Sequence, residues 1–240
     1  MKVELTRQVG YVDVNPSFRM KLGVFFRLLQ EAAIVHSERV GVGPKSLMKG
    51  GTVWFLNRIV AEINRYPAYQ ENVRVITWYR GNTRFIAHRD FLVFSGREKL
   101  AAASSMWLLV DVEKKRLQQI PPEMGAAYTT EDDSACEMNI EGWEPERSRI
   151  ADFTIDITTR YCDLDPVGHL NNTVYFDFVE TLVARAFDGN VDIRSLKMQF
   201  QKEIKLDNRW VSAGIQKTET GGRFSIFTGE TVFASGEITC

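Results

Sequence analysis

The feature that most constrains the fold of this 240-residue chain is an internal repeat, because a duplicated unit has to fold twice. With an offset of 150 residues, the segment 11–30 aligns with the segment 161–180, and both copies read as a strand, a turn and a helix. The identical positions in the first copy are Tyr11, Asp13, Pro16, Val24 and Phe26. We therefore expect two similar units within one chain.

Each copy of the repeat is followed by a run of strand patterns. In the first half the periodicity predicts a helix over 22–40 and strands near 52–64, 71–80, 84–95 and 99–111. In the second half it predicts a helix over 172–187 and strands near 191–206, 209–218, 223–228 and 231–239. Because such short spacings are typical of hairpins, each unit should be one long helix against an antiparallel sheet, an α+β arrangement.

The organisation follows from this pattern. We expect an N-terminal unit over residues 1–120, a linker over 121–150 and a C-terminal unit over 151–240. The linker begins with Pro121-Pro122 and carries eight acidic residues against two basic ones, with weak periodicity and room for a short helix.

Composition and charge narrow the functional classes. Three scattered cysteines fit neither a disulfide framework nor a metal-ligand spacing, and no window is long and apolar enough to span a membrane. The amino-terminal residues also lack the apolar core of a signal peptide, so we expect a cytoplasmic protein without a metal or redox cofactor. Residues 1–120 carry a net charge of +9 and residues 121–240 a net charge of −10. This asymmetry fits either two ordinary solvated surfaces or attraction of an anionic partner, whereas nucleic acid is not expected because no binding motif is recognisable.

The richest chemistry lies in the second copy of the repeat. Asp165 and His169 stand four residues apart in an Asp-Pro-Val-Gly-His string, directly before the helix that Asn171 or Asn172 should cap. Free N–H groups and the helix dipole at such a position favour developing negative charge, which suits hydrolysis of an acyl compound. The other two histidines, His36 in a helix and His88 in a strand, are expected to be structural.

The chain resembles the acyl-acyl carrier protein thioesterases over most of its length. The resemblance rests on Leu29-Gln30-Glu31-Ala32-Ala33 with His36, on Asn64-Arg65-Tyr66-Pro67, on Val75-Ile76-Thr77-Trp78, on Arg89-Asp90-Phe91-Leu92-Val93, on Ala103-Ser104-Ser105-Met106-Trp107, on Ile120-Pro121-Pro122-Glu123, on Asp163-Leu164-Asp165, on His169-Leu170-Asn171-Asn172, on Tyr175 and on Phe200 with Glu203. It implies two tandem hot-dog repeats that pair within one chain, with catalytic residues in the C-terminal repeat and an acyl pocket shaped by the N-terminal one. It also implies hydrolysis of fatty acyl-acyl carrier protein, with carrier protein as the partner, while homodimerisation stays open.

Carried over by position, the resemblance assigns catalysis to Asp165, His169 and Glu203. The chain has Val167 and Ile204 where the plant enzymes have asparagine and cysteine, which excludes a cysteine nucleophile at that position. The Asp-Pro-x-Gly string is also similar to the loop of single-repeat acyl-CoA thioesterases, in which the aspartate is catalytic.

Thioester hydrolysis requires an activated water and a stabilised oxyanion. Asp165 and Glu203 are the candidate water activators, and Glu180 is an alternative carboxylate. Alternation places Glu203 on the polar face of its strand, unless a bulge at Lys202 redirects it.

His169 would orient water or polarise the carbonyl, and Asn171 would hold His169 in place. The backbone N–H groups from Gly168 to Leu170 are the expected oxyanion donors. An acyl-CoA thioesterase and a non-catalytic acyl-thioester-binding protein remain the alternative functions.

Overall fold

A computed structural model describes residues 1–147, 149, 151–189 and 191–240 of the chain. Its first half contains β1 (Val3–Gln8), α1 (Leu22–Arg39), α2 (Pro44–Lys49), β2 (Thr52–Ile63), β3 (Asn72–Asn82), β4 (Ile86–Ser95), β5 (Glu98–Asp111), β6 (Arg116–Gln118) and α3 (Pro122–Ala127). The second half contains β7 (Phe153–Thr158), α4 (Val174–Ala186), β8 (Ser195–Phe200), β9 (Trp210–Thr218), β10 (Gly221–Thr228) and β11 (Thr231–Thr239). Residues 148 and 150, at the end of the expected linker, lie outside the described residues.

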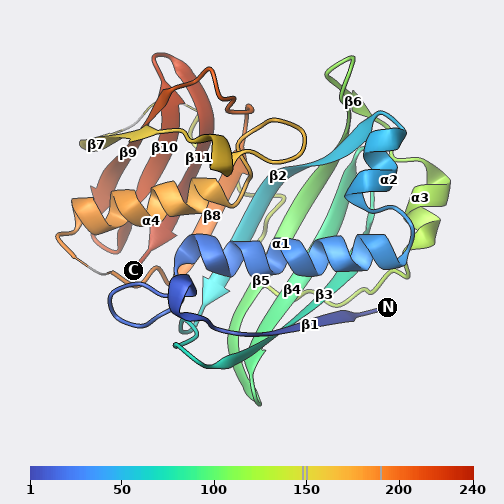
Figure 1. Cartoon of the computed structure of the whole chain (residues 1–240), viewed down its shortest axis with the longest axis horizontal. Coiled ribbons are helices and arrows are strands. Elements are labelled where there is room, and N and C mark those ends of the chain that lie inside the picture. Colours follow the sequence, from blue (N-terminus) through green and yellow to red (C-terminus); the bar gives the residue numbers. More distant parts are fainter. Residues whose placement is uncertain (148, 150, 190) are drawn as a thin grey trace.

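The strands form one continuous sheet. Counted from each outer edge toward the centre, the two halves contribute their equivalent strands in the same order. The order is β1-β3-β4-β5-β2 followed by β8-β11-β10-β9-β7, with β6 paired to β5. At the centre β2 and β8 pair antiparallel, so that Ile59 lies opposite Met198. Figure 1 shows both long helices on one face of this curved sheet. The predicted fold class, an α+β pair of tandem repeats, is confirmed.

The two copies fold alike at the level of single residues. Short 3-10 turns occupy 11–13 and 161–163, and isolated bridges join Val14 to Met20 and Leu164 to Leu170. The following turns both contain a residue with positive φ, Phe18 at 58° and Gly168 at 86°. Every one of these pairs is separated by the 150-residue offset read from the sequence.

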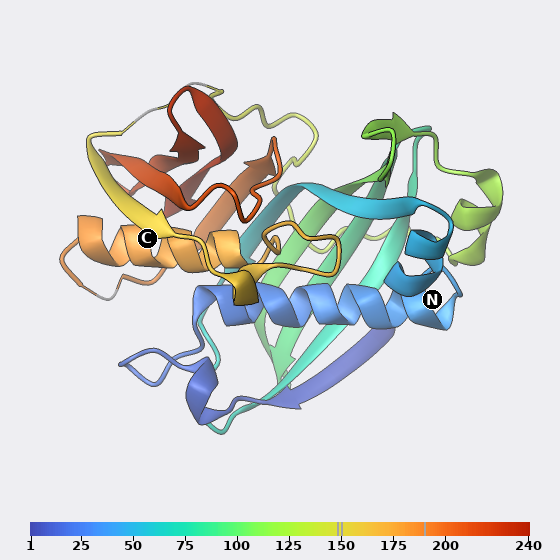
Figure 2. The ribbon, with the colours of Figure 1, turned by 45° about the horizontal axis from the view of Figure 1, so that its top comes forward.

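The helices α1 and α4 meet near their N-termini, where they lie side by side in Figures 1 and 2. Phe26 stacks on Phe176 with ring centroids 3.7 Å apart, and Arg27 forms an ion pair with Asp177. Both pairs join equivalent positions of the two copies, so a pseudo-two-fold axis passes between them. The close approach depends on Gly23, because a Cβ there would lie 1.8 Å from Asp177 Oδ1.

Helix α1 matches its predicted span to within one residue. Its buried side chains, among them Leu22, Phe25 and Leu29, recur at helical spacing and pack into the main core. The helix ends before Gly41, whose φ of 81° places it in the left-handed region that commonly terminates helices. None of the helices in the described part of the chain has the length and apolar character needed to cross a lipid bilayer.

The strand expected over 191–206 is shorter than predicted, and this changes the site. Strand β8 ends at Phe200, and the N–H groups of Gln201 and Lys202 both donate to the Phe233 carbonyl. This irregularity coincides with the break in alternation at Lys202. The chain then leaves the strand, so Glu203 does not occupy the strand face on which alternation had placed it.

The segment between the repeats covers the outer face of the N-terminal half of the sheet. Cys136 and Ile140 pack against Val60, Ala102 and Met106, which form a second small core. The linker contains a short helix, α3, which begins directly after Pro121 with Pro122 in its first turn. The face that carries α1 and α4 lies opposite this small core, and of the segment Tyr128 reaches α1, where its hydroxyl donates to Ser37 Oγ.

Candidate active site

The turn that holds Asp165 is stabilised by the side chain of Asp165 itself. Its Oδ1 atom accepts hydrogen bonds from the N–H groups of Val167 (2.9 Å) and His169 (3.2 Å). In the first copy, Asn15 Oδ1 accepts the equivalent bonds from Ser17 and Arg19 at 3.0 and 3.1 Å. In each copy, therefore, the Oδ1 atom of this residue accepts the hydrogen bonds that hold the turn. Among the residues that the structure describes, no donor binds Asp165 Oδ2, which leaves this atom for water or substrate.

His169 and Glu203 meet beside this turn. His169 Nε2 lies 3.6 Å from Glu203 Oε1, because the Leu170 N–H donates to the Ile204 carbonyl at 2.8 Å and aligns the two segments. Partial burial acts to raise the pKa of Glu203, but a hydrogen bond from Lys205, the nearby His169 and Lys115 together lower it. Glu203 is therefore an ionised carboxylate and a weaker base than an ordinary glutamate.

The backbone N–H groups expected to stabilise an oxyanion are already bonded within the protein, and that expectation is wrong. Gly168 donates to the Asp165 carbonyl, His169 to Asp165 Oδ1 and Leu170 to the Ile204 carbonyl. These bonds form the turn and dock it, so the donors cannot turn toward a substrate. Within the described residues, the N–H group of Asn172 donates to no protein acceptor.

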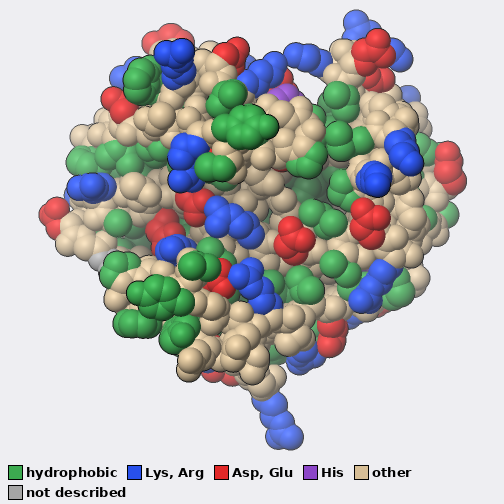
Figure 3. Space-filling view, in the orientation of Figure 1, with side chains coloured by type: hydrophobic (Ala, Val, Ile, Leu, Met, Phe, Trp, Pro, Cys, Tyr) green, Lys and Arg blue, Asp and Glu red, His purple; other side chains and the backbone are tan. Residues whose placement is uncertain are grey.

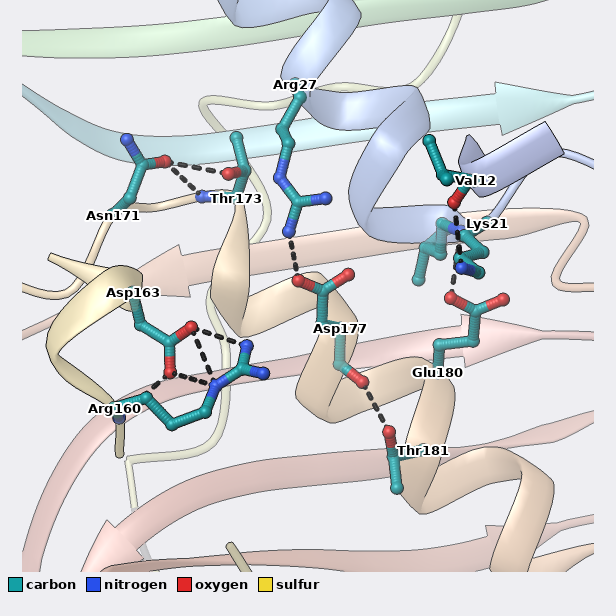
Figure 4. Close-up of polar contacts among 11 residues, drawn as sticks. Val12, Lys21, Arg27, Arg160, Asp163, Asn171, Thr173, Asp177, Glu180 and Thr181 are labelled. Carbon is teal, nitrogen blue, oxygen red and sulfur yellow. Dashed lines mark hydrogen bonds and ion pairs between the residues drawn. The ribbon is translucent and has the colours of Figure 1, made fainter. Parts of the chain in front are cut away.

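Asn171 fixes the start of helix α4. Its Oδ1 accepts hydrogen bonds from the backbone N–H (2.9 Å) and the hydroxyl (2.8 Å) of Thr173, as Figure 4 shows. The regular helix begins at Val174, two residues later than predicted. Asn171 thus supports the segment that follows His169, although no hydrogen bond joins these two side chains in the described structure.

A cavity of about 360 Å³ extends from the Asp165 turn into the N-terminal repeat. The C-terminal repeat contributes Asp165, Pro166, Val167, Asn171 and Asn172 to its lining. The N-terminal repeat contributes Gln30, Glu31, Ala33, Ile34, Ser37, Pro44, Leu47, Met48, Val53, Trp54, Tyr79, Ala87, His88, Arg89 and Trp107, and the expected linker contributes Tyr128. His169 and Glu203 do not line this cavity, whereas Asp165 does. Apolar side chains of α1, α2 and the sheet make up much of the wall.

A buried polar cluster borders the cavity inside the N-terminal repeat. The guanidinium of Arg89 binds His36 Nδ1 at 3.0 Å and Thr77 Oγ1 at 3.2 Å, and the ring of Tyr128 lies against it. Burial, reinforced by Arg89, lowers the pKa of His36 to about 4, so this imidazole is neutral and accepts from the guanidinium. His36 is structural, as predicted, whereas His88 lines the cavity.

Two other sequence expectations concern carboxylates and metals. Glu180, the alternative carboxylate, lies outside the cavity, where its Oε2 accepts a hydrogen bond from the Leu22 N–H at 3.0 Å. Among the described residues, no group of three or more His, Cys, Asp or Glu side chains is arranged to hold a metal ion. The sequence assigns no catalytic role to Gln30, yet Gln30 lines the cavity together with Asp165.

Two family models match the chain. The acyl-ACP thioesterase N-terminal domain matches residues 3–128 and the acyl-ACP thioesterase C-terminal domain matches residues 147–230. The chloroplastic dodecanoyl-[acyl-carrier-protein] hydrolase of Cinnamomum camphora is 27% identical over 214 residues, which cover 82% of this chain and 54% of that protein. The oleoyl-acyl carrier protein thioesterase 2 of Arabidopsis thaliana is 23% identical over 201 residues, covering 75% and 54%. The chain thus spans about half the length of the curated relatives it matches.

Solved structures share the fold over nearly the whole chain. The 12:0-ACP thioesterase from Umbellularia californica aligns with a TM-score of 0.85 and 22% identity, covering 99% of this chain and 96% of that one. An acyl-ACP thioesterase from Bacteroides thetaiotaomicron aligns with a TM-score of 0.84 and 19% identity, covering 99% and 97%. At these identities the likeness concerns the fold.

Proposed function

Because this chain belongs to the acyl-ACP thioesterase family, we propose that it hydrolyses the thioester of fatty acyl-acyl carrier protein and releases the free fatty acid. The observation that carries the proposal is the cavity, which runs from the Asp165 carboxylate into the largely apolar interior of the N-terminal repeat. A fatty acyl chain would lie in that interior, with its thioester carbonyl beside Asp165. The named relatives act on acyl groups carried by acyl carrier protein.

Asp165 is the proposed base. Its Oδ1 is held by the turn, and its free Oδ2 would take a proton from a water that attacks the carbonyl carbon. The C–S bond then breaks and the thiolate leaves with the sulfur electrons. An alkyl thiol has a pKa of about 8.5, so this leaving group needs little acid assistance. The proton on Asp165 returns to solvent or to the thiolate.

Glu203 and His169 are proposed to position the reaction rather than to take the first proton. The lowered pKa of Glu203 makes it a poor proton acceptor, and neither side chain lines the cavity. An ionised Glu203 3.6 Å from His169 Nε2 would orient the imidazole. Of the two carboxylates carried over from the family, Asp165 is therefore the better placed to activate water.

Acyl carrier protein is the proposed partner. On the face shown in Figure 3, basic and acidic side chains are interspersed and form no continuous basic field. A local basic group does exist: Lys115 and Lys205 lie 3.8 and 3.1 Å from Glu203. Lys202 lines a surface pocket together with Glu203 and Lys205. These lysines, beside the catalytic turn, are better candidates to meet an anionic carrier than the N-terminal repeat as a whole. A cytoplasmic location and a possible homodimer stay predictions from the sequence.

The deciding experiment measures hydrolysis of carrier-protein and CoA thioesters of graded chain length side by side. We expect higher kcat/KM with the carrier-protein esters. Equal or better turnover of the CoA esters would reject the carrier-protein assignment, and no turnover of either would favour an acyl-binding protein.

Two substitutions test the residues. Asp165→Asn and His169→Ala should each lower kcat at least about 100-fold, on the scale expected for positioned acid–base groups. Asp165→Asn should leave the fold intact, because Asn15 makes the same turn bonds in the first copy. The reverse substitution, Asn15→Asp, is the matched control and should leave kcat unchanged.

A further inference from the structure

The pseudo-two-fold axis relates each contact between the helices to a second one. Because Phe26 stacks on Phe176 and Arg27 pairs with Asp177, positions 150 apart face each other across the axis. In such a symmetric pair, two residues that lie side by side have counterparts that lie side by side as well. The contact of interest is that between Leu22 and Glu180, because its counterpart falls inside the cavity.

At the end away from the cavity, a carboxylate closes the start of helix α1. Glu180, on α4, accepts a hydrogen bond from the Leu22 N–H, and Figure 4 shows its side chain directed at this helix start. The counterparts of Leu22 and Glu180 are Asn172 and Gln30. The structure agrees with this symmetry, since Gln30 and Asn172 both line the cavity with Asp165.

The cavity end differs from its counterpart in having a neutral amide instead of a carboxylate. Neither the Gln30 amide nor the Asn172 N–H is hydrogen-bonded to another group among the residues that the structure describes. Both are hydrogen-bond donors, and both residues line the cavity in which the proposed function places a thioester carbonyl. A carbonyl oxygen becomes more negative as water adds to its carbon, and two donors aimed at it stabilise that charge.

We propose that Gln30 is a further catalytic residue, whose side-chain N–H donates, together with the Asn172 N–H, to the thioester carbonyl oxygen and to the oxyanion formed from it. This assignment rests on the proposed function and deepens it: the N-terminal repeat supplies a polar group to the reaction as well as the acyl pocket. It also replaces the donors expected at Gly168 to Leu170, which the turn has consumed.

The counterpart residue explains why a glutamine, and not a glutamate, suits this position. Glu180 lies against a helix N-terminus and yet burial raises its pKa to about 7. A glutamate at position 30 would in the same way be ionised at alkaline pH, where it would repel an oxyanion, and protonated at acidic pH, where its O–H could donate. A glutamine donates at every pH.

Gln30→Leu and Gln30→Glu test the assignment, with Glu180→Gln as the matched control at the counterpart position. Gln30→Leu should lower kcat about 100-fold with little change in KM, the scale of removing one oxyanion donor. Gln30→Glu should show a similar deficit relative to the original protein at pH 8.5 that shrinks toward pH 5.5. Glu180→Gln should keep its kcat. A Gln30→Leu variant within twofold of the original kcat would overturn the proposal, as would a pH-independent deficit in Gln30→Glu.

A second measurement separates this inference from the proposed function. The carbonyl stretch of a bound ¹³C-labelled acyl thioester is recorded in Asp165→Asn and in Asp165→Asn/Gln30→Leu, neither of which needs to turn over substrate. Hydrogen bonding lowers the stretching frequency, so we expect a low frequency in the single variant and a higher one in the double variant. Equal frequencies would reject Gln30 as a donor, whatever the activity of the original protein; a protein that hydrolyses no thioester while showing the frequency difference would contradict the proposed hydrolysis alone.

Discussion

Replacing Glu180 by glutamine should stabilise the protein at alkaline pH and leave it nearly unchanged at acidic pH. The carboxylate is largely buried between α4 and the start of α1, and burial raises its pKa from 4.5 to about 7 despite the hydrogen bond from Leu22. A group whose pKa is higher in the folded state contributes stability that is present below its unfolded pKa and lost as the pH rises through its folded pKa. For Glu180 that window runs from pH 4.5 to about 7.

The magnitude follows from the shift. A difference of about 2.5 between the two pKa values corresponds to about 3 kcal/mol in the free energy of unfolding over the whole window, and about 2.5 kcal/mol of it falls between pH 5 and pH 8. Glutamine cannot ionise, yet it keeps an oxygen that accepts from the Leu22 N–H. The counterpart position already carries Gln30, so the shape of a glutamine is compatible with this kind of contact.

Urea unfolding of both proteins at pH 5 and pH 8 measures the effect. The stability of Glu180→Gln relative to the original protein should rise by about 2–3 kcal/mol between these pH values, with equal m-values. Glu180→Ala removes the acceptor as well as the charge, and should gain less. The reasoning is refuted if the difference between Glu180→Gln and the original protein does not change with pH.

Three further predictions concern the site and its surroundings. In the original protein His36 should cost about 2 kcal/mol of unfolding free energy as the pH falls from 7 to 4.5, because its pKa is 6.5 in the unfolded state and about 4 in the folded state. His36→Gln should abolish this pH-dependent loss, which urea unfolding at both pH values measures. An equal loss in the variant and the original protein would contradict the prediction. Because Glu203 is proposed to orient His169 and not to activate water, Glu203→Gln should lower kcat about tenfold, less than Asp165→Asn does. A larger loss of kcat than that of Asp165→Asn would identify Glu203 as the base. Gly168→Ala should cost about 1 kcal/mol of stability through backbone strain alone, since φ is 86° and no atom lies within 4 Å of the added Cβ; an unchanged unfolding midpoint would show that the turn relaxes.

The turn and the two long helices could be predicted because their determinants are local, whereas the short helix α2 was not expected. Asp165 accepts bonds from N–H groups two and four residues later, and an Asp-Pro-x-Gly string specifies that geometry by itself. The length of α1 follows from its apolar spacing and from Gly41. The offset of 150 residues then extended each local result to the other copy.

The position of Glu203 could not be predicted in this way, because it depends on a pairing between distant segments. The alternation of apolar and polar residues predicts one strand over 191–206. The hydrogen bonds from the Gln201 and Lys202 N–H groups to the Phe233 carbonyl end that strand at Phe200. The contact with His169 follows from the Leu170–Ile204 bond, which joins residues that no local pattern connects. The expectation of oxyanion donors at Gly168 to Leu170 fails for the same reason, since a free N–H group is recognised only when every other partner is known.

The difference between the two ends of the helix pair follows from a few substitutions in a duplicated framework. Both ends have a turn fixed by a side-chain oxygen, from Asn15 or Asp165, and both place a helix start against the neighbouring helix. At one end the Leu22 N–H is occupied by the carboxylate of Glu180. At the other end the equivalent residues, Asn172 and Gln30, line a cavity instead. In the proposed mechanism the carboxylate in the turn would supply the base, and the neutral amide on the helix would leave the donors for substrate. These two exchanges of charge would direct the chemistry to one end while the shared backbone stays the same.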